Sequence, residues 1–101
     1  MSKTIKEWTD EIERLVEVQY GGAWQTWDQA PKLLMYLVTE CSEAMEAWRD
    51  DDQEHFGEEL ADIAIRLFDT ARQLHYDLEE EIDKKMKINW TREWQHGRVN
   101  V

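Results

Sequence analysis

The amino-acid sequence predicts an all-α protein, and three observations support this fold class. Apolar residues recur three and four positions apart through most of the chain, which is the period of an amphipathic helix. Only one proline and four glycines occur in the 101 residues, so few positions force a helix to end. The chain is 42% hydrophobic and contains six tryptophans, which is too apolar for a disordered acidic segment. Because this length is close to the commonest domain size, we expect a single domain over residues 1–101.

The first helix is expected at about residues 4–20. Its polar side carries Glu7, Glu11 and Arg14, and its apolar stripe is formed by Ile5, Trp8, Ile12, Leu15 and Val16. Gly21 and Gly22 follow directly, and glycine at this position is a strong signal for the end of a helix. A loop over residues 23–30 is then expected to lead into the second helix.

The second helix is expected at residues 31–49, because Pro31 suits the first turn of a helix. It is the most apolar segment of the chain, and it ends at an acidic link formed by residues 50–52. A third helix follows over about residues 53–76, and its length makes it the central element of the fold.

A fourth helix is expected at about residues 78–91. Acidic residues come first and Lys84, Lys85 and Lys87 come last, which is the order that the helix dipole favours. From about residue 91 we expect an irregular tail. The second and third helices are apolar over wide arcs, so a single copy would leave apolar surface in water. A homo-oligomer, either a dimer or a tetramer, is therefore expected.

The charge of the chain excludes several partners. Lysine and arginine number 12 against 23 aspartates and glutamates, which gives a net charge of -11 and argues against a nucleic-acid polymer as partner. The longest uncharged apolar run, residues 33–38, is far shorter than the roughly 20 residues of a membrane span, so no membrane partner is expected. One cysteine and an N-terminus without an apolar signal segment favour a cytoplasmic protein.

Two pairs of acidic residues lie in segments that otherwise favour burial. Glu40 and Glu43 follow an apolar run, while Glu59 and Asp62 alternate with apolar residues. Residues three apart on a helix share one side, so two antiparallel helices would bring four carboxylates together. Such a group is tolerable only beside a cation, and ligands that are all oxygen favour Mg²⁺ or Mn²⁺ over zinc. The alternative is a solvated groove in which these acids pair with Lys32, Arg49 or Arg66.

Basic residues are concentrated near the C-terminal end. The cluster consists of Lys84, Lys85, Lys87, Arg92 and Arg98, and it is accompanied by Asn89 and His96. Cations beside a metal stabilise the charge of transferring phosphoryl groups, which favours an anion-binding role. The alternative is that these residues only complement the helix dipole and the preceding acidic run, which explains the lysines better than the two arginines.

These motifs together resemble the MazG-like family of all-α nucleoside triphosphate pyrophosphohydrolases. Glu40-Cys41-Ser42-Glu43 and Glu59-Leu60-Ala61-Asp62 are similar to that family's ExxE and ExxD metal motifs, and residues 85–98 resemble its C-terminal KxxxNxxRPxxHGK-like pattern. The resemblance covers residues from about 31 to 98. It implies a four-helix bundle completed by homo-oligomerisation. It also implies Mg²⁺-dependent cleavage of a nucleoside or deoxynucleoside triphosphate between the α and β phosphates, yielding a monophosphate and pyrophosphate.

The resemblance also implies roles for individual residues. Metal ligands, which act in catalysis through an activated water, would be Glu40, Glu43, Glu59 and Asp62. Phosphates would be held by Lys85, Asn89 and Arg92, with His96 and Arg98 completing the pattern. Three positions differ: Glu93 replaces a common proline, Arg98 replaces the usual lysine, and Thr39 stands where some two-metal relatives have a further glutamate. Thr39 therefore leaves the general base and the number of metal ions open.

The aromatic residues have two interpretations. Trp24 and Trp27 lie in the loop before the second helix, where they are available to stack on a nucleobase or to pack on a neighbouring subunit. Trp8, Tyr36 and Trp48 lie on helical stripes and are expected in the core.

Two functions follow from these observations. The first, implied by the family resemblance, is nucleotide pyrophosphohydrolysis, which would remove aberrant or surplus nucleotides. The alternative is a helical oligomerisation module without catalytic activity, in which the four acids form a salt-bridge network.

Overall fold

The computed structural model describes residues 2–22 and 24–92. These residues contain α-helices, one short 3-10 helix and no β-strand, which confirms the all-α fold class. The elements in chain order are α1 (Ile5–Tyr20), η1 (Trp27–Gln29), α2 (Ala30–Arg49), α3 (Gln53–Gln73) and α4 (Leu78–Thr91).

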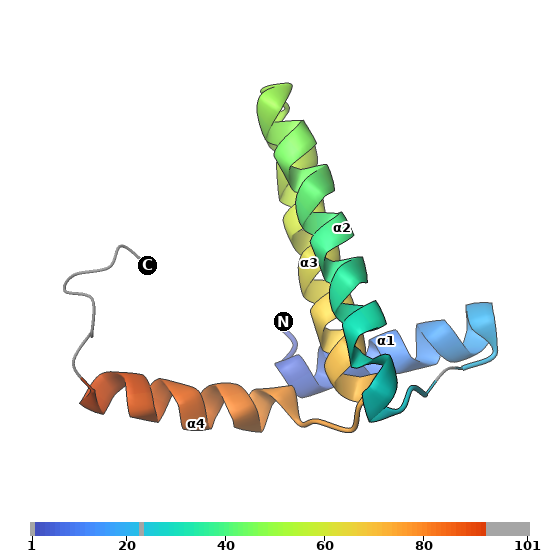
Figure 1. Cartoon of the computed structure of the whole chain (residues 1–101), viewed down its shortest axis with the longest axis vertical. Coiled ribbons are helices and arrows are strands. Elements are labelled where there is room, and N and C mark those ends of the chain that lie inside the picture. The colour runs from blue at the N-terminus through green and yellow to red at the C-terminus, as the bar shows by residue number, and fades with distance from the viewer. Residues whose placement is uncertain (1, 23, 93–101) are drawn as a thin grey trace.

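An antiparallel hairpin of α2 and α3 dominates the structure (Figure 1). The turn between them is closed by hydrogen bonds from the Asp51 and Asp52 N–H groups to the carbonyls of Trp48 and Ala47. Asp51 adopts a left-handed conformation with φ 54°, which aspartate tolerates better than most residues. Asp52 then caps α3 by accepting a hydrogen bond from the His55 N–H at 3.1 Å. The acidic link expected from the sequence is thus a tight turn followed by a helix cap.

Helices α1 and α4 lie across the end of the hairpin that is opposite the α2–α3 turn (Figure 1). Both contact α3, and they also contact each other. Because neither runs along the hairpin, most of α2 and the first half of α3 contact each other but no further helix from the described part of the same chain.

A capping box begins α1. The Thr4 N–H donates to Glu7 Oε1 at 2.9 Å, and the Glu7 N–H donates to Thr4 Oγ1 at 3.1 Å. Gly21 ends the helix with φ 76°, and its N–H bonds to the Glu17 carbonyl. Both ends of α1 therefore lie close to where the sequence places them.

Replacing Glu7 with glutamine is expected to make the free energy of unfolding less sensitive to acid. The hydrogen bonds from the Thr4 N–H and side chain lower the pKa of Glu7 below its ordinary value of 4.5. A carboxyl whose pKa is lower in the folded state stabilises the fold above its unfolded pKa, and this stabilisation is lost as pH falls through the folded-state pKa. The free energy of unfolding measured from about pH 6 to about pH 3 should therefore fall less steeply in Glu7→Gln.

Glu17→Gln is the control for this prediction, because Glu17 lies on the same helix outside the capping box. It should retain the acid dependence of the unmodified chain. An identical pH dependence in both variants would show that the capping box contributes nothing to acid stability.

The end of α3 differs from the sequence expectation. The helix ends at Gln73 rather than near residue 76, because the Tyr76 N–H bonds to the Ala71 carbonyl at 2.8 Å and closes the last turn. His75 supplies the left-handed residue of this turn with φ 66°, a role usually taken by glycine. Since no glycine or proline marks the position, the sequence carries no local signal for it.

The apolar core of one chain is small. Among the described residues, the buried apolar side chains are Ile12, Leu33, Ala44, Ala47 and Ala71. The expectation that Trp8, Tyr36 and Trp48 lie in the core is wrong for the single chain, since they are 43%, 43% and 66% exposed. The cause is the arrangement of the helices, because no described element covers Tyr36 and Trp48 on α2 or the side of α1 that carries Trp8. No helix in the described ranges is long and apolar enough to cross a bilayer.

Candidate metal centre

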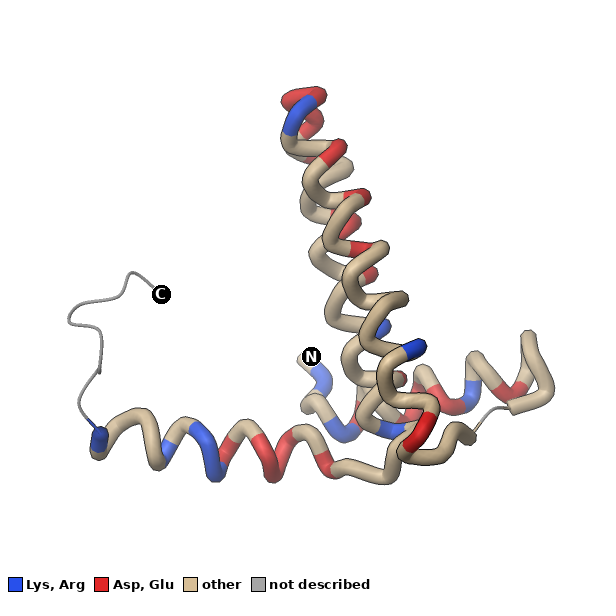
Figure 2. The backbone as a smooth tube through the Cα atoms, in the orientation of Figure 1, with Lys and Arg blue, Asp and Glu red and all other residues tan. Residues whose placement is uncertain are grey.

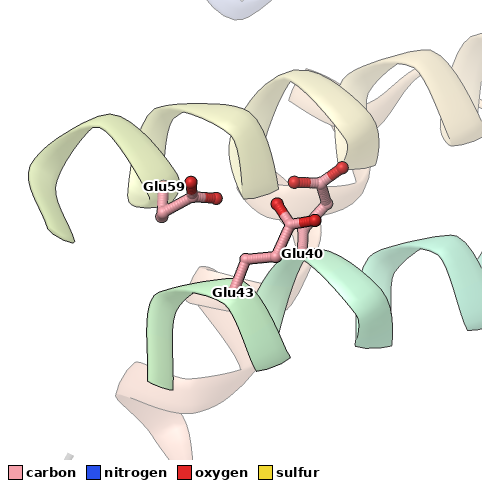
Figure 3. A group of neighbouring side chains, drawn as sticks. All are labelled: Glu40, Glu43 and Glu59. Carbon is pink, nitrogen blue, oxygen red and sulfur yellow. The ribbon is translucent and has the colours of Figure 1, made fainter. Parts of the chain in front are cut away.

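Three carboxylates meet between the two helices of the hairpin. Glu40 and Glu43 project from α2 and Glu59 from α3, and all three point into the space between the helices (Figure 3). One carboxylate oxygen of each lies within 4.8 Å of one from each of the others. The antiparallel pairing expected from the sequence therefore brings these three acids together.

Glu59 is the buried member of the group, with 5% of its surface exposed. Its Oε1 lies 3.0 Å from His55 Nε2, one turn earlier on α3. Its Oε2 is buried and has no hydrogen-bond partner among the described residues. A buried carboxylate oxygen without a partner is costly, so this atom needs a cation or a donor that the described protein groups do not provide.

Two basic side chains border the carboxylates. The Arg66 guanidinium on α3 lies 3.6 Å from Glu40 Oε1 and also lies over the Tyr36 ring. His55 is on the other side, and its pKa is raised chiefly by its hydrogen bond to Glu58 and further by the Glu59 and Asp52 carboxylates. The alternative expectation is that these acids pair with neighbouring bases. Glu40 does so with Arg66, but one oxygen of Glu59 has no partner among the described residues.

This donor set fits a hard divalent cation. All three candidate ligands are carboxylates, they come from two paired helices, and one of them has a buried oxygen with no hydrogen-bond partner among the described residues. Oxygen-only sites of this kind suit hard divalent cations such as Mg²⁺, Mn²⁺ and Ca²⁺.

Asp62 is exposed, and it is not part of this three-carboxylate group. It lies three residues beyond Glu59 on α3, so both residues lie on the same side of the helix. Together with Glu40 it lines a cavity of about 530 Å³ between α1 and the hairpin. The fourth expected ligand therefore lies at the boundary between the carboxylate group and this cavity.

Further acidic residues surround the opposite side of the group. A hollow of about 280 Å³ near the α2–α3 turn is lined by Glu43, Glu46, Ala47, Asp50, Asp52, His55 and Glu59. Acidic residues accordingly follow the hairpin to its turn (Figure 2). The sequence reasoning did not assign His55 to the site, although its position four residues before Glu59 places both on one face of the helix.

The basic residues expected to hold phosphates lie elsewhere in the single chain. Lys85, Asn89 and Arg92 belong to α4 or its C-terminal cap, and α4 does not contact α2 within the described residues. The chain enters α4 at the base of the hairpin (Figure 1), whereas Glu59 lies about 21 Å further along α3 from Gln73. His96 and Arg98 lie outside the described residues.

The two loop tryptophans have different surroundings. Trp24 stacks on the His75 ring with centroids 4.6 Å apart, and the Arg72 guanidinium lies 5.0 Å from its ring centre. Trp27 lies in η1 and is 73% exposed. Trp24 thus has an aromatic partner within the chain, and Trp27 is the more available of the two for a ligand or subunit.

Comparison with known proteins gives one match, to a family model. The model of the MazG-like family matches residues 31–98, which include the carboxylate group and α4. No curated protein and no solved structure matches the chain.

Proposed function

We propose, since the chain belongs to the MazG-like family, that it is a Mg²⁺-dependent nucleoside triphosphate pyrophosphohydrolase. It would cleave nucleoside or deoxynucleoside triphosphates between the α and β phosphates and release pyrophosphate, a reaction suited to clearing surplus nucleotides from a cytoplasmic pool. One observation carries the proposal: within a group of three carboxylates, the Glu59 Oε2 atom is buried and has no partner among the described residues.

The chain's own carboxylates would hold the ion. Glu40, Glu43 and Glu59 are the candidate ligands, with Asp62 one turn along α3. His55 Nε2 contacts Glu59 Oε1, so Glu59 Oε2 is the oxygen that is left for the ion. When bound, Mg²⁺ supplies Lewis acidity toward the phosphoryl oxygens and lowers the pKa of water. Cys41 is exposed on α2, and hydrolysis by an activated water requires no covalent nucleophile.

The basic side chains that contact the phosphates would belong to a second copy of the chain. In one copy, Lys85, Asn89 and Arg92 are held away from the carboxylates by the course of α4. We infer that α4 of a partner brings them to the hairpin, where they would stabilise the charge on the departing pyrophosphate, with His96 and Arg98 completing the set.

The large exposed surface of one chain supports an oligomer. Each copy would contribute a single domain over residues 1–101, and a second copy would complete its core. The chain exposes 8351 Å², whereas a compact protein of 12.2 kDa exposes about 6,100 Å². The exposed large apolar side chains of the hairpin are Leu34, Met35, Tyr36, Val38, Met45, Trp48, Leu60, Ile65 and Leu67. A second copy would cover this surface and form the four-helix bundle that the hairpin alone lacks.

Light scattering during size-exclusion chromatography should therefore give a mass of at least twice 12.2 kDa, as a dimer or a tetramer. Val38→Glu, on the exposed side of α2, should shift the protein toward the monomer, because a charge buried in an apolar interface is unfavourable. Val18→Glu is the matched control, since Val18 is exposed on α1 away from the hairpin, and it should leave the mass unchanged. A monomeric unmodified chain would contradict the proposal.

A panel of ribonucleoside and deoxyribonucleoside triphosphates tests the activity. With Mg²⁺ we expect a nucleoside monophosphate and pyrophosphate as products, and with EDTA we expect neither. Release of inorganic phosphate and a diphosphate would place cleavage at a different bond and contradict the proposal. No hydrolysis of any nucleotide would favour the oligomerisation module, in which the Arg66–Glu40 and His55–Glu59 contacts serve only structure.

A further inference from the structure

The cavity between α1 and the hairpin continues from the carboxylate group toward the base of the hairpin. It has a volume of about 530 Å³, which lies in the range of small-molecule sites. Glu40 and Asp62 line the part nearest the carboxylates, and Asp69 and Gln73 line it further along α3. Asp62 and Gln73 are about 16 Å apart along the helix axis. The cavity therefore extends well beyond the candidate metal ligands.

The walls of the cavity are partly apolar. Ile12, Leu15 and Val16 contribute from α1, and Ile65 contributes from α3. Aliphatic walls of this kind suit the faces of an aromatic ring, while a few fixed polar groups set its orientation. The cavity thus has the composition expected for the base of a nucleotide whose phosphates lie at the carboxylates.

Gln73 is the fixed polar group that the protein itself does not use fully. Its side-chain Nε2 donates to Asp69 Oδ2 at 2.6 Å, and an ionised carboxylate can only accept, so the amide orientation is determined. Asp69 is held in turn by Arg72, whose Nε and Nη2 donate to Oδ1 at 3.0 and 2.7 Å. Gln73 is 6% exposed, and its Oε1 has no hydrogen-bond partner among the described residues.

A buried acceptor without a partner favours a ligand that brings an N–H donor. The exocyclic amino group of cytosine or adenine is such a donor, whereas uracil and hypoxanthine carry a carbonyl oxygen at the corresponding ring position. A carbonyl there would place one acceptor against another. We propose that this cavity binds the nucleobase and that Gln73 Oε1 accepts a hydrogen bond from its exocyclic amino group. This inference rests on the proposed pyrophosphohydrolase function and specifies its substrate class.

The unmodified chain tests the inference with pairs of substrates. The values of kcat/KM are compared for dCTP against dUTP and for dATP against dITP, in the presence of Mg²⁺. We expect the amino-bearing member of at least one pair to be preferred about 10-fold or more, because its analogue leaves the buried acceptor unpaired. Equal values within both pairs would overturn the inference and leave the proposed hydrolysis intact.

A variant assigns the preference to Gln73. In Gln73→Met the preference should fall to about 3-fold or less, because the acceptor is gone while the side-chain volume is similar. Gln53→Met is the matched control on the same helix, since Gln53 is exposed and outside this cavity, and it should keep the preference. An undiminished preference in a folded Gln73→Met variant would overturn the assignment. If that variant does not fold, the substrate pairs decide alone.

Calorimetric binding of the α,β-methylene analogues of both pairs, dCTP with dUTP and dATP with dITP, separates the two proposals. Preferential binding of an amino-bearing analogue without hydrolysis of any triphosphate would support the base site and refute the activity. Equal affinities within both pairs of analogues would overturn the base site.

Discussion

Glu59→Gln is expected to reduce pyrophosphohydrolase activity by about 100-fold or more, since even residues behind the metal ligands commonly contribute 10- to 100-fold. The buried carboxylate would lose the charge and one acceptor oxygen with which it binds the ion. Glutamine has nearly the same shape, so the helix and its packing should be preserved. The measurement is kcat/KM for the best substrate of the panel at saturating Mg²⁺.

The same variant has a second readout that does not depend on activity. Mg²⁺ should raise the Tm of the unmodified chain, because an ion that binds only the folded state stabilises it, and this rise should be much smaller in Glu59→Gln. Without Mg²⁺ the variant should be at least as stable as the unmodified chain, since one of three mutually repelling carboxylates is neutral.

Glu54→Gln is the control for both readouts. Glu54 lies on the same helix, is exposed and is not part of the carboxylate group, so activity and the Mg²⁺-dependent rise in Tm should stay close to those of the unmodified chain. Equal activities of Glu59→Gln and the unmodified chain would refute the metal site.

Arg72→Met is expected to destabilise the fold by about 3 kcal/mol or more, which is typical for removing one partner of a buried ion pair. The Arg72 side chain is 5% exposed and lies 2.7 Å from Asp69 Oδ1 and 3.7 Å from Glu13 Oε2 on α1. Its guanidinium also lies over Trp24. Without Arg72, the buried Asp69 carboxylate keeps only Gln73 among the partners described above, and the link to α1 is lost. Urea unfolding followed by circular dichroism measures the loss.

Arg14→Met provides the comparison, because the Arg14–Glu11 pair is exposed and long at 3.9 Å. Exposed pairs of this kind contribute about 0 to 1 kcal/mol, so its effect should be small. In the double variant Arg72→Met/Asp69→Asn, part of the lost stability should return, since the charge left unpaired is removed. Equal destabilisation by Arg14→Met and Arg72→Met would show that burial does not strengthen the Arg72 network.

The helices themselves were largely predictable from the sequence. Gly21, Pro31 and the acidic link at residues 50–52 mark three helix ends by local conformational preference, and the structure confirms all three within one or two residues. The end of α3 was not predictable, because His75 takes a conformation that its residue type rarely adopts. Local sequence signals therefore predict a helix end where the residue type itself favours that end, and not elsewhere.

The candidate site was predictable in part, since three of the four predicted acids meet in the structure while Asp62 is not part of the group. The spacing of Glu40, Glu43 and Glu59 on two adjacent helices was enough to expect a shared centre, because residues three apart share a helix face. The spacing does not predict that Glu59 is buried with one oxygen unpaired within residues 2–22 and 24–92, or that Arg66 lies beside Glu40. Those facts depend on which faces of α2 and α3 pack together.

The sequence by itself thus determined the helical elements, the positions of the acidic pairs and the basic character of α4, since each depends on residues a few positions apart. Only the tertiary structure decided that α4 leaves the hairpin at its base, that Trp8 and Trp48 remain exposed, and that Gln73 lines a cavity while its buried Oε1 has no partner among the described residues. The physical reason is that burial and hydrogen-bond satisfaction depend on contacts between segments far apart in the chain. Helical periodicity, by contrast, depends only on near neighbours.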